Sequence, residues 1–582
     1  MPDATLLDLL ARAAGSSLGV RFLDRDERGT VHTYAELMER AAHTGAALRE
    51  LGVQPGDRVA IILPTSPEFY DAFFGAIHIG AVPVPLYPPV RLGRLEEYVS
   101  RTAELLRGCE TRIVLADART AGIIGRSVEA AEPPLGLRTV DALRRRGETD
   151  GATEAHAADP DEVAFIQHSS GTTGVPRPIA LTHRAIRENV RAIRNRLLNA
   201  WPELDGRRHA AVSWLPLYHD MGLIGSVLTA LAHPTELTLI PPELFVARPA
   251  IWLRAVSRYR GTISGAPNFA YALCADRVRD EELKGHDLSS WLVALNGAEP
   301  VTASALHRFA ERFARFGFRA EALTPVYGLA EATLAVTFSD PARRFSEGTF
   351  DADALARDGV ARPANGAGVT LVGVGRPLPG IELRIRDEAG VQAEDGMLGR
   401  VLVRGPSVMV PDRPVGTWLD TGDTGFLRDG ELFLYGRAKD VLILHGQKHA
   451  PQVVEHALDL LPGVRAGCVA ALGVPGNDDR AESLVVLMER SRGEPASGDQ
   501  ELARSAHRRI VAQTGLVPDR VVILEPGTLP RTSSGKIRRL EARRRYVRDA
   551  LSPPDRRSAF KLVREMMRSG LALVRLRRSM AR

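Results

Sequence analysis

Six consecutive small polar residues give this chain its clearest chemical signal. They are drawn only from Ser, Gly and Thr: Ser169, Ser170, Gly171, Thr172, Thr173 and Gly174. Glycines tolerate the positive φ that turns successive backbone N–H groups inward, and the hydroxyls add further donors, so this loop can enclose an anion. An apolar run at 163–166 precedes the loop and is typical of a buried strand, and a helix-like segment starts at Thr182. This position favours a polyphosphate site over a merely flexible polar loop.

The loop does not have the Walker A sequence of P-loop proteins, because Arg177-Pro178 stands where Gly-Lys-Ser/Thr is required. The other candidate, Gly535-Lys536, lacks the upstream glycine and is followed by Ile537. The sequence therefore gives little support to a kinase or a P-loop ATPase.

Five other side chains have the chemistry to complete a nucleotide site. Tyr327 can stack on a base, and Glu331, four residues along a helix expected to start there, can offer a hard oxygen ligand to Mg²⁺. Asp423 can accept from both ribose hydroxyls, and Arg437 can reach the ribose or an α-phosphate. Lys536 lies at the tip of a Thr/Ser/Gly loop in a chain with only five lysines among 76 basic residues. A lysine retained there indicates that a compact charge matters.

Small residues follow several predicted strands, at 264–271 and at 293–300. Ligands of open parallel sheets bind beyond the carboxyl ends of the strands, so a flat ring could lie against the backbone there. His219 follows another buried strand and begins a run of small and apolar residues that can line a tunnel. We expect its imidazole to point into the site, and a hydrogen-bonded core histidine is the alternative.

The chain is too long for one hydrophobic core, since single cores stop growing near roughly 250–300 residues. Strand, helix and strand patterns within 56–84 form a βαβ unit, which indicates a parallel sheet. The predicted fold class is α/β, with a large multi-subdomain N-terminal domain of parallel sheets flanked by helices at 1–438. A small mobile α+β domain follows at 439–550, its first helix expected at 452–460.

Composition and charge exclude several classes of protein. The chain is 44% hydrophobic and 25% charged, as expected for a globular protein. Its three dispersed cysteines predict a reducing, cytoplasmic setting with neither a disulfide framework nor a zinc site. The amino terminus has no basic region typical of a secretion signal, and four prolines within 73–90 argue against a membrane span.

The net charge of +5 comes from the carboxyl-terminal tail, because residues 553–582 hold nine basic and two acidic residues. The main body lacks the basic excess of a nucleic-acid-binding protein. The tail, 551–582, has apolar residues at helical spacing with Arg between them. It could contact an acidic carrier protein or an anionic membrane surface, and a solvated terminal helix is an equal alternative.

Seven motifs stand in the order and spacing of the adenylate-forming superfamily, which comprises acyl-CoA synthetases, luciferases and peptide-synthetase adenylation domains. They lie at 169–176, 213–225, 296–299, 327–333, 420–423, 436–440 and 532–536. Within this superfamily the chain most resembles the fatty acyl-AMP ligases, through segments 84–89, 214–223, 265–274, 296–300 and 327–334. The segment 338–370 is similar to an insertion of that family, where it is associated with delivery of the acyl-adenylate to a carrier protein rather than to coenzyme A.

The resemblance implies ATP and Mg²⁺ as cofactors and assigns each site residue a role. The phosphates would be held by residues 169–174 with Arg177, adenine by Gly297, Ala298 and Tyr327, ribose by Asp423 and Arg437, and Mg²⁺ by Glu331. Lys536 would bridge the carboxylate and the α-phosphate, and it is implied to be catalytic together with Glu331 and His219. The implied acyl pocket comprises Trp214, His219, Asp220, Met221, Ile224, Asn268 and Phe269. The small domain would rotate about a hinge at Lys439 and Asp440.

The expected function is activation of a medium- or long-chain fatty acid as its adenylate, with release of pyrophosphate. The acyl group would then pass to the phosphopantetheine thiol of a separate acyl carrier protein, or of a polyketide or peptide synthetase carrier domain. A fatty acyl-CoA synthetase is the alternative within the same chemistry. A non-catalytic acyl- or nucleotide-binding protein is the alternative of another class, which Arg177-Pro178 in place of the family's Lys-Gly favours. Intact Glu331, Asp423 and Lys536 argue against it.

Overall fold

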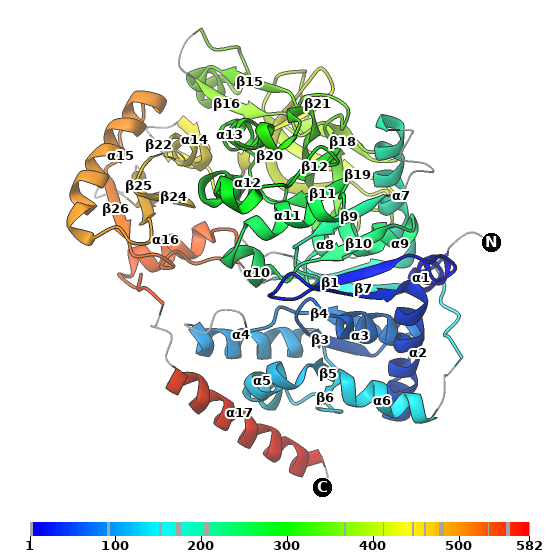
Figure 1. The fold of residues 1–582 in the computed structure, drawn as a ribbon. Helices are drawn as coiled ribbons and strands as arrows, with labels where there is room; N and C mark the ends of the chain where they lie inside the picture. Colours follow the sequence, from blue (N-terminus) through cyan, green and yellow to red (C-terminus); the bar gives the residue numbers. More distant parts are fainter. Residues whose placement is uncertain are drawn as a thin grey trace.

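The computed structural model describes residues 4–89, 94–150, 154–169, 176–201, 209–365, 368–410, 413–444, 447–458, 461–475, 482–532, 535–554 and 559–580. A large body contains two sheets of mainly parallel strands flanked by helices, and a small α+β part lies beside it (Figure 1). The predicted α/β fold class is confirmed.

The larger sheet has nine strands in the order β17-β14-β13-β12-β11-β9-β10-β1-β2. Its strands are β1 (Gly19–Leu23), β2 (Gly29–Thr33), β9 (Ala210–Ser213), β10 (Glu236–Leu239), β11 (Ile263–Ala266), β12 (Val293–Asn296), β13 (Leu323–Gly328), β14 (Ala335–Phe338) and β17 (Arg376–Pro377). The run from β13 through β12, β11, β9 and β10 to β1 is parallel, and the outer strands are antiparallel. The carboxyl ends of neighbouring strands therefore meet at one edge, where small residues had been noticed in the sequence.

Helices cover this sheet and fix its strands. They are α1 (Leu6–Ala14), α7 (His183–Ala200), α8 (Asp220–Gly222), η3 (Leu223–Leu228), α9 (Thr229–Ala232), α10 (Pro242–Ala247), α11 (Ala250–Arg258), α12 (Asn268–Arg277) and α13 (Ala303–Phe313), with short η4 (Asp280–Leu283), η5 (Ala314–Phe316) and η6 (Ala320–Ala322). An aromatic cluster around the fully buried Trp252, Trp291 and Phe309 fills the core between α11, α13 and the strands, with edge-to-face rings that favour this packing.

The second sheet is parallel throughout, in the order β4-β3-β5-β6. Its elements are β3 (Arg58–Ile62), β4 (Val82–Pro85), β5 (Ile113–Ala116), β6 (Leu137–Thr139), α2 (Tyr34–Glu50), α3 (Pro67–His78), α4 (Leu95–Gly108), α5 (Ala118–Ala131) and α6 (Val140–Asp150). A ladder of β7 (Val163–His168) and β8 (Pro178–Thr182) joins it to the larger sheet, and Phe165 of β7 packs edge-to-face on Phe73 of α3. The two sheets thus share one core.

Antiparallel strands complete the large body after η7 (Ala330–Ala332). They are the hairpin β15 (Glu347–Phe350) and β16 (Val369–Val372), with η8 (Ala354–Asp358) between them, and the sheet β18 (Glu382–Arg386), β19 (Gly399–Arg404), β20 (Leu419–Arg428) and β21 (Glu431–Arg437). The segment 338–370, predicted as an insertion, contains this hairpin and packs through Phe350 on Phe426 and Phe433 of the sheet.

The small part begins after β21. Its elements are β22 (Leu442–Leu444), β23 (Gln447–His449), α14 (Pro451–Ala457), β24 (Val464–Pro475), β25 (Glu482–Arg490), η9 (Ala496–Gly498), α15 (Asp499–Thr514), β26 (Arg520–Leu524) and α16 (Arg539–Val547). The strands β24, β25 and β26 form one sheet, with β26 parallel to β25. Val454 of α14 and Ile510 of α15 pack on one face of that sheet, in a core separate from those of the large body.

The last helix, α17 (Ala559–Met580), leaves the small part and returns to α5 of the large body (Figure 1). The hydroxyl of Ser569 donates to the carbonyl oxygen of Ile123 at 2.6 Å, and Arg126 pairs with the buried Glu565 at 3.1 Å. The opposite face exposes apolar side chains, namely Met567, Leu571 and Val574. The tail predicted as a basic amphipathic helix is a helix, with one side packed and one side exposed.

Three local predictions differ from the structure. Residues 178–182, where the sequence predicts no strand, form β8 because they pair with β7 and bury Ile179 and Leu181. Glu331 lies in the short turn η7 and not in a helix, since β14 follows at once and pairs back on β13. The helix expected at 452–460 is α14, which ends at Ala457.

Cys109, Cys274 and Cys468 are buried and free. Within the described residues, no helix combines the length and the apolar character needed to cross a bilayer.

Acid should destabilise the large body through His183. Burial lowers the pKa of this imidazole from 6.5 to about 4, and its Nδ1 accepts a hydrogen bond from the backbone N–H of Leu6 at 3.1 Å. The unfolded chain takes up this proton first, so the stabilisation is complete above pH 6.5 and is lost, by about 3 kcal/mol, as pH falls to 4.

We expect the midpoint temperature of thermal unfolding to fall further between pH 7 and pH 4.5 in the wild type than in His183→Asn. The amide oxygen of that asparagine can still accept the hydrogen bond from the N–H of Leu6. The pKa values of His168 and His456 are also lowered to about 4, and both titrate in either protein, so the comparison isolates His183. Equal shifts in the two proteins would contradict the prediction.

Candidate active site

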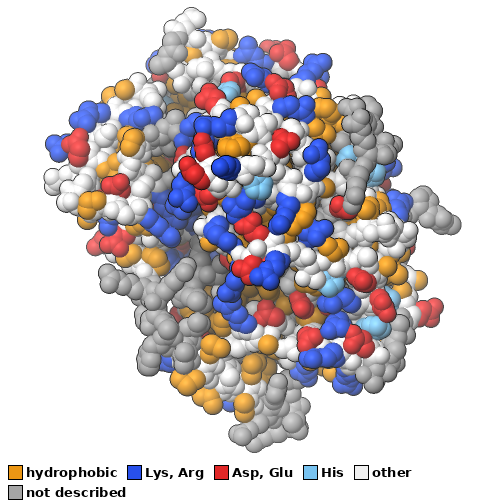
Figure 2. Space-filling model, in the orientation of Figure 1, with side chains coloured by type: hydrophobic (Ala, Val, Ile, Leu, Met, Phe, Trp, Pro, Cys, Tyr) orange, Lys and Arg blue, Asp and Glu red, His pale blue; other side chains and the backbone are white. Residues whose placement is uncertain are grey.

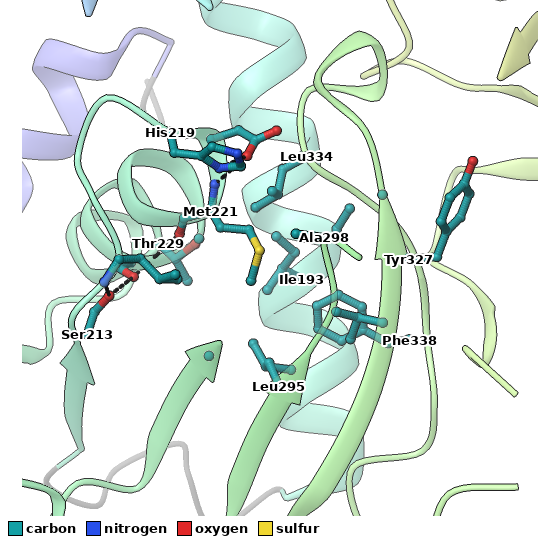
Figure 3. A pocket seen from close by; sticks show the side chains of 18 of the residues that line it. Ile193, Ser213, His219, Met221, Thr229, Leu295, Ala298, Tyr327, Leu334 and Phe338 are labelled. Atoms are coloured by element: carbon teal, nitrogen blue, oxygen red, sulfur yellow. Dashed lines mark hydrogen bonds and ion pairs between the residues drawn. The ribbon is translucent and has the colours of Figure 1, made fainter. Parts of the chain in front are cut away.

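A cavity of about 340 Å³ begins at the carboxyl edge of the larger sheet and extends along its strands to their amino ends. Residues along β9, β11, β12 and β13 line it, together with α7 and η3. In Figure 3, Ile193, Leu295, Leu334 and Met221 surround an open space. Open parallel sheets bind ligands at this edge, so the position agrees with a binding site.

One half of the cavity is polar and charged, and it brings together residues far apart in the sequence. Its walls include Ala298, Tyr327, Glu331, Arg437 and Lys536. The last of these belongs to the small part, so the cavity is closed by both parts of the molecule. Lys and Arg side chains also gather on the surface where the two parts meet (Figure 2). The arrangement suits a ligand with several negative charges.

The backbone after β12 approaches β13 very closely. A Cβ on Gly297 would lie 2.8 Å from the carbonyl oxygen of Val326, so only glycine fits there. The next residue, Ala298, has a φ of 67°, which is uncommon for a residue with a side chain. Ala298 and Tyr327 both line the cavity, and the small side chain of Ala298 leaves room for a flat ring against the backbone.

Lys536 is buried among charges. Burial is the largest effect and lowers the pKa of its ammonium group, partly opposed by the carboxylate of Asp220. A turn holds the residue in place, since its N–H donates to Thr532 Oγ1 at 3.0 Å and its carbonyl oxygen accepts from the N–H of Thr532 at 2.8 Å. A partly desolvated ammonium interacts strongly with an incoming anion.

The lowered pKa of Lys536 predicts a pH dependence. The charged form is present below that pKa and is lost as pH rises through it. The fall of kcat/KM at alkaline pH should therefore begin at a lower pH than it would if Lys536 were exposed to solvent. Because kcat/KM reports on the free enzyme, steady-state rates from pH 6 to pH 10 measure this directly. A Lys536→Ala variant that keeps the same alkaline limb would contradict the assignment.

Asp423 lies behind the charged half of the cavity and orients two side chains of that half, Tyr327 and Arg437. The phenol of Tyr327 donates to Asp423 Oδ2 at 2.7 Å, and Arg437 Nε donates to Oδ1 at 3.1 Å. Burial raises the pKa of Tyr327, so the phenol stays protonated and can donate. Each carboxylate oxygen has a second lone pair, which leaves room for a ligand hydroxyl.

His219, labelled in Figure 3, and Asp220 both line the cavity, and His219 Nδ1 lies 2.5 Å from Asp220 Oδ1. Burial alone would raise the pKa of Asp220, but the charges of His219 and Lys536 outweigh it and hold this pKa below its ordinary value. The backbone N–H of Met221 also donates to Asp220 Oδ1 at 2.7 Å. His219, which the sequence predicts to point into the site, is one of the lining residues of the cavity.

Four residues expected in the acyl pocket are absent from the described cavity lining: Trp214, Ile224, Asn268 and Phe269. The ring of Trp214 stacks on Phe245 with centroids 3.9 Å apart, and Ile224 is fully buried in the core. The side chain of Asn268 donates to Thr302 Oγ1 at 3.1 Å. Of the residues expected in the acyl pocket, His219, Asp220 and Met221 reach the described lining.

Of the predicted phosphate loop, Ser170, Gly171, Thr172, Thr173 and Gly174 lie outside the described residues. Its two flanks, Ser169 and Arg177, line the cavity. The N–H of Ser169 donates to the carbonyl oxygen of Arg177 at 2.9 Å, so the β7–β8 ladder delivers both ends of the loop to the charged half.

The predicted hinge lies at the junction of the two parts. Lys439 lines the cavity, and Asp440 pairs with Arg539 of the small part at 3.4 Å. Burial raises the pKa of Asp440.

Sequence patterns predict no role for Glu299 or for a polar group at the other end of the cavity. Glu299 accepts from the N–H of Phe269 at 2.6 Å, and burial raises the pKa of its carboxyl group. The polar group consists of His209, His233, Thr235 and Thr262. A histidine or threonine placed directly before a strand was the available signal, but such residues also occur at solvent-exposed strand ends.

Two carboxylates line the described cavity, Asp220 and Glu331, and Asp220 is already in contact with His219. Among the described residues, no group of three or more His, Cys, Asp or Glu side chains could hold a metal ion. Mg²⁺ usually binds through one or two carboxylates together with substrate phosphates, so Glu331 in the cavity wall fits the ion that the sequence predicts.

The AMP-binding enzyme family matches residues 11–410, which include every described lining residue of the cavity except Thr421, Gly422, Arg437, Lys439 and Lys536. The chain belongs to this family. It is an AMP-binding, adenylate-forming ligase, as its motifs predicted.

Relatives and solved structures of the same length support this assignment. A long-chain-fatty-acid–AMP ligase of Mycobacterium tuberculosis is 31% identical and covers 90% of this chain and 93% of its own. A 4-hydroxyphenylalkanoate adenylyltransferase of Mycobacterium marinum is 32% identical and covers 96% of this chain and 93% of its own. A solved fatty acyl-adenylate ligase, from work on E. coli and L. pneumophila, is 34% identical with a TM-score of 0.85 and covers 94% of this chain and 99% of its own.

Proposed function

We propose that this AMP-binding enzyme activates a medium- or long-chain fatty acid as its acyl-adenylate and passes the acyl group to a separate carrier protein. The M. tuberculosis relative is named for long-chain fatty acids and the M. marinum relative for 4-hydroxyphenylalkanoates, which are both carboxylic acids. The adenylation half of the proposal rests on this common chemistry.

The observation that carries the proposal is the continuity of a charged site with an apolar channel. Lys536, Arg437 and Glu331 line one half of the cavity. We call the other half the acyl channel, whose apolar lining is Ile193, Leu197, Ile263, Leu295, Leu334 and Phe338. A molecule with one anionic end and a long hydrocarbon chain matches this division, because burial of the chain removes apolar surface from water.

Adenylation requires that two anions meet. A carboxylate oxygen attacks the α-phosphorus of ATP, a P–O bond forms, and pyrophosphate leaves with the electron pair of the bond that breaks. Lys536 would lie between the carboxylate and the α-phosphate and neutralise the charge that develops there. Ala298 and Tyr327 would flank adenine, Asp423 and Arg437 would hold the ribose, and Mg²⁺ on Glu331 would neutralise the phosphates.

Transfer requires that Lys536 withdraws so that a phosphopantetheine thiol can reach the acyl carbonyl. The thiolate attacks that carbon and AMP leaves. A rotation of the small part about Lys439 and Asp440 would achieve this, and hinge motions of this kind are common between domains.

The inserted hairpin supports a carrier protein as the acceptor. Leu355 of η8 and Phe350 of β15 belong to the same apolar cluster as Ala450 and Val453 of the small part. This contact would oppose rotation of the small part. Transfer to coenzyme A and transfer to a carrier protein both require that rotation, but coenzyme A is a small diffusible thiol. A docked carrier protein could supply binding energy to overcome the contact.

Purified enzyme with ATP, Mg²⁺ and a panel of fatty acids tests the function, with coenzyme A or a holo carrier protein as the acceptor. We expect pyrophosphate release and acyl-carrier product without acyl-CoA, and we expect Leu355→Glu to raise acyl-CoA formation. Efficient acyl-CoA synthesis by the wild type would favour an acyl-CoA synthetase. ATP binding without adenylate would favour a non-catalytic binding protein.

A further inference from the structure

The end of the acyl channel away from Lys536 is polar. His209, Thr235 and Thr262 line it, and each directly precedes one of the three neighbouring strands β9, β10 and β11. These strands are parallel, with Glu236 beside Ala210 and Ile263 beside Ala211, so the three residues share the amino edge of the sheet. The charged half of the cavity lies at the opposite, carboxyl edge.

The polar side chains at this end contact one another. His209 Nδ1 lies 3.4 Å from Thr262 Oγ1, and the rings of His209 and His233 are 6.1 Å apart. The hydroxyl of Thr262 also donates to the carbonyl oxygen of Ala210 at 3.2 Å. Imidazole and hydroxyl groups can both donate and accept, so this cluster can bind an oxygen atom of either kind.

The walls between the two ends are largely apolar. Leu295 and Phe338 from the strands and Ile193 from α7 face the space (Figure 3). The hydroxyls of this stretch are already paired within the protein: Ser226 donates to Ser213 at 2.9 Å, and Thr229 donates to the carbonyl oxygen of Ile224 at 2.9 Å. An unsubstituted hydrocarbon chain suits these walls but not the cluster beyond them, where its end would displace water from polar groups.

The sheet gives the length of the channel. Four residue steps separate His209 from Ser213, which corresponds to about 13 Å at ~3.3 Å per residue of strand. An extended carbon chain advances about 1.25 Å per atom, given bonds of ~1.5 Å and angles of ~111°. About ten carbons therefore span the length of β9, from its carboxyl end at Ser213 to the polar cluster at His209.

We propose that this enzyme prefers an acyl substrate of about ten carbons whose far end carries an oxygen substituent, bound by His209, His233 and Thr262. The inference rests on the proposed adenylation of a carboxylic acid and adds the class of acid. The polar cluster acts as a ruler as well as a specificity site, because a shorter chain cannot reach it and a longer unsubstituted chain must bury its methyl end among polar groups.

The test compares decanoic acid, 10-hydroxydecanoic acid and decanedioic acid in pyrophosphate release with ATP and Mg²⁺. We expect kcat/KM for at least one of the two oxygenated acids to exceed that for decanoic acid about tenfold. Comparison of 10-hydroxydecanoic acid with decanedioic acid then identifies whether the enzyme binds a hydroxyl or a carboxylate. Thr262→Val keeps the side-chain volume and removes the hydroxyl, and His209→Leu provides a second variant. In both variants, kcat/KM for the oxygenated acid should be about equal to kcat/KM for decanoic acid.

Thr238→Val is the matched control, since Thr238 is buried in β10 but is absent from the described cavity lining. It should leave the ratio of these kcat/KM values unchanged. A wild type that uses decanoic acid as well as both oxygenated acids would overturn the inference while leaving the proposed adenylation in place.

Calorimetric binding of the same acids provides a readout without turnover. Tighter binding of an oxygenated acid without pyrophosphate release would keep the inference and contradict the proposed function. Equal binding of all three acids would overturn the inference.

Discussion

Replacement of Lys536 by alanine should lower the rate of acyl-adenylate formation about 10²–10³-fold, the usual cost of removing one preorganised group that stabilises developing charge. Lys536 is buried in the charged half of the cavity, where Arg437 and Lys439 also lie. The remaining cations can still attract the nucleotide, so we expect kcat to fall more than the affinity for ATP. Pyrophosphate release under saturating ATP measures the effect.

Two comparisons make this result specific. Lys448→Ala is the matched control, because Lys448 also belongs to the small part but is exposed and pairs with Glu388. It should retain wild-type adenylation. Lys536→Ala should also transfer a preformed acyl-adenylate to a carrier protein at nearly the wild-type rate, since the proposed transfer step has Lys536 withdrawn. A variant that keeps adenylation within a few-fold of wild type would refute the role.

Glu331→Gln should lower adenylation about 10²-fold and raise the Mg²⁺ concentration needed for half-maximal rate, because metal clamps on phosphates stabilise the transition state by several kcal/mol. The substitution keeps the shape of the side chain and removes its charge. Glu331 occupies a short turn, and its own backbone carbonyl oxygen accepts from the N–H of Met409 at 2.7 Å. The backbone of Glu331 is therefore held independently of its side-chain carboxylate.

The measurement is a Mg²⁺ titration of pyrophosphate release at fixed ATP. Glu110→Gln is a suitable control, because Glu110 pairs with Arg58 on the surface, away from the described cavity lining. A Glu331→Gln protein with an unchanged Mg²⁺ requirement would show that another group holds the ion.

Residue type and spacing predicted much of the charged half of this site. Tyr327, Glu331, Arg437 and Lys536 are predicted from their side chains, which can stack on a base, bind Mg²⁺ or pair with phosphate, and all four line the cavity. The α/β class followed from the strand, helix and strand pattern. Both depend on local features that a sequence records directly.

The acyl channel was harder to predict, because its lining depends on which way each side chain turns. Trp214 and Met221 belong to one motif, yet Trp214 packs against Phe245 and Met221 lines the cavity. The strand β8 was missed for a related reason: residues 178–182 gain their hydrogen bonds only from β7, across a loop of small residues. Such pairing is a tertiary property that local propensity does not contain.

The docking of α17 on α5 makes the small part a segment anchored at both ends. Residues 548–558 alone connect α16 to α17, and the twelve residue steps from Val547 to Ala559 can extend to at most about 42 Å at ~3.5 Å per step. While α17 stays on α5, the end of α16 is therefore confined to a sphere of that radius around Ala559. The connector sets the outer limit of every position that the small part can adopt, and shortening it would restrict those positions without altering a single residue of the cavity.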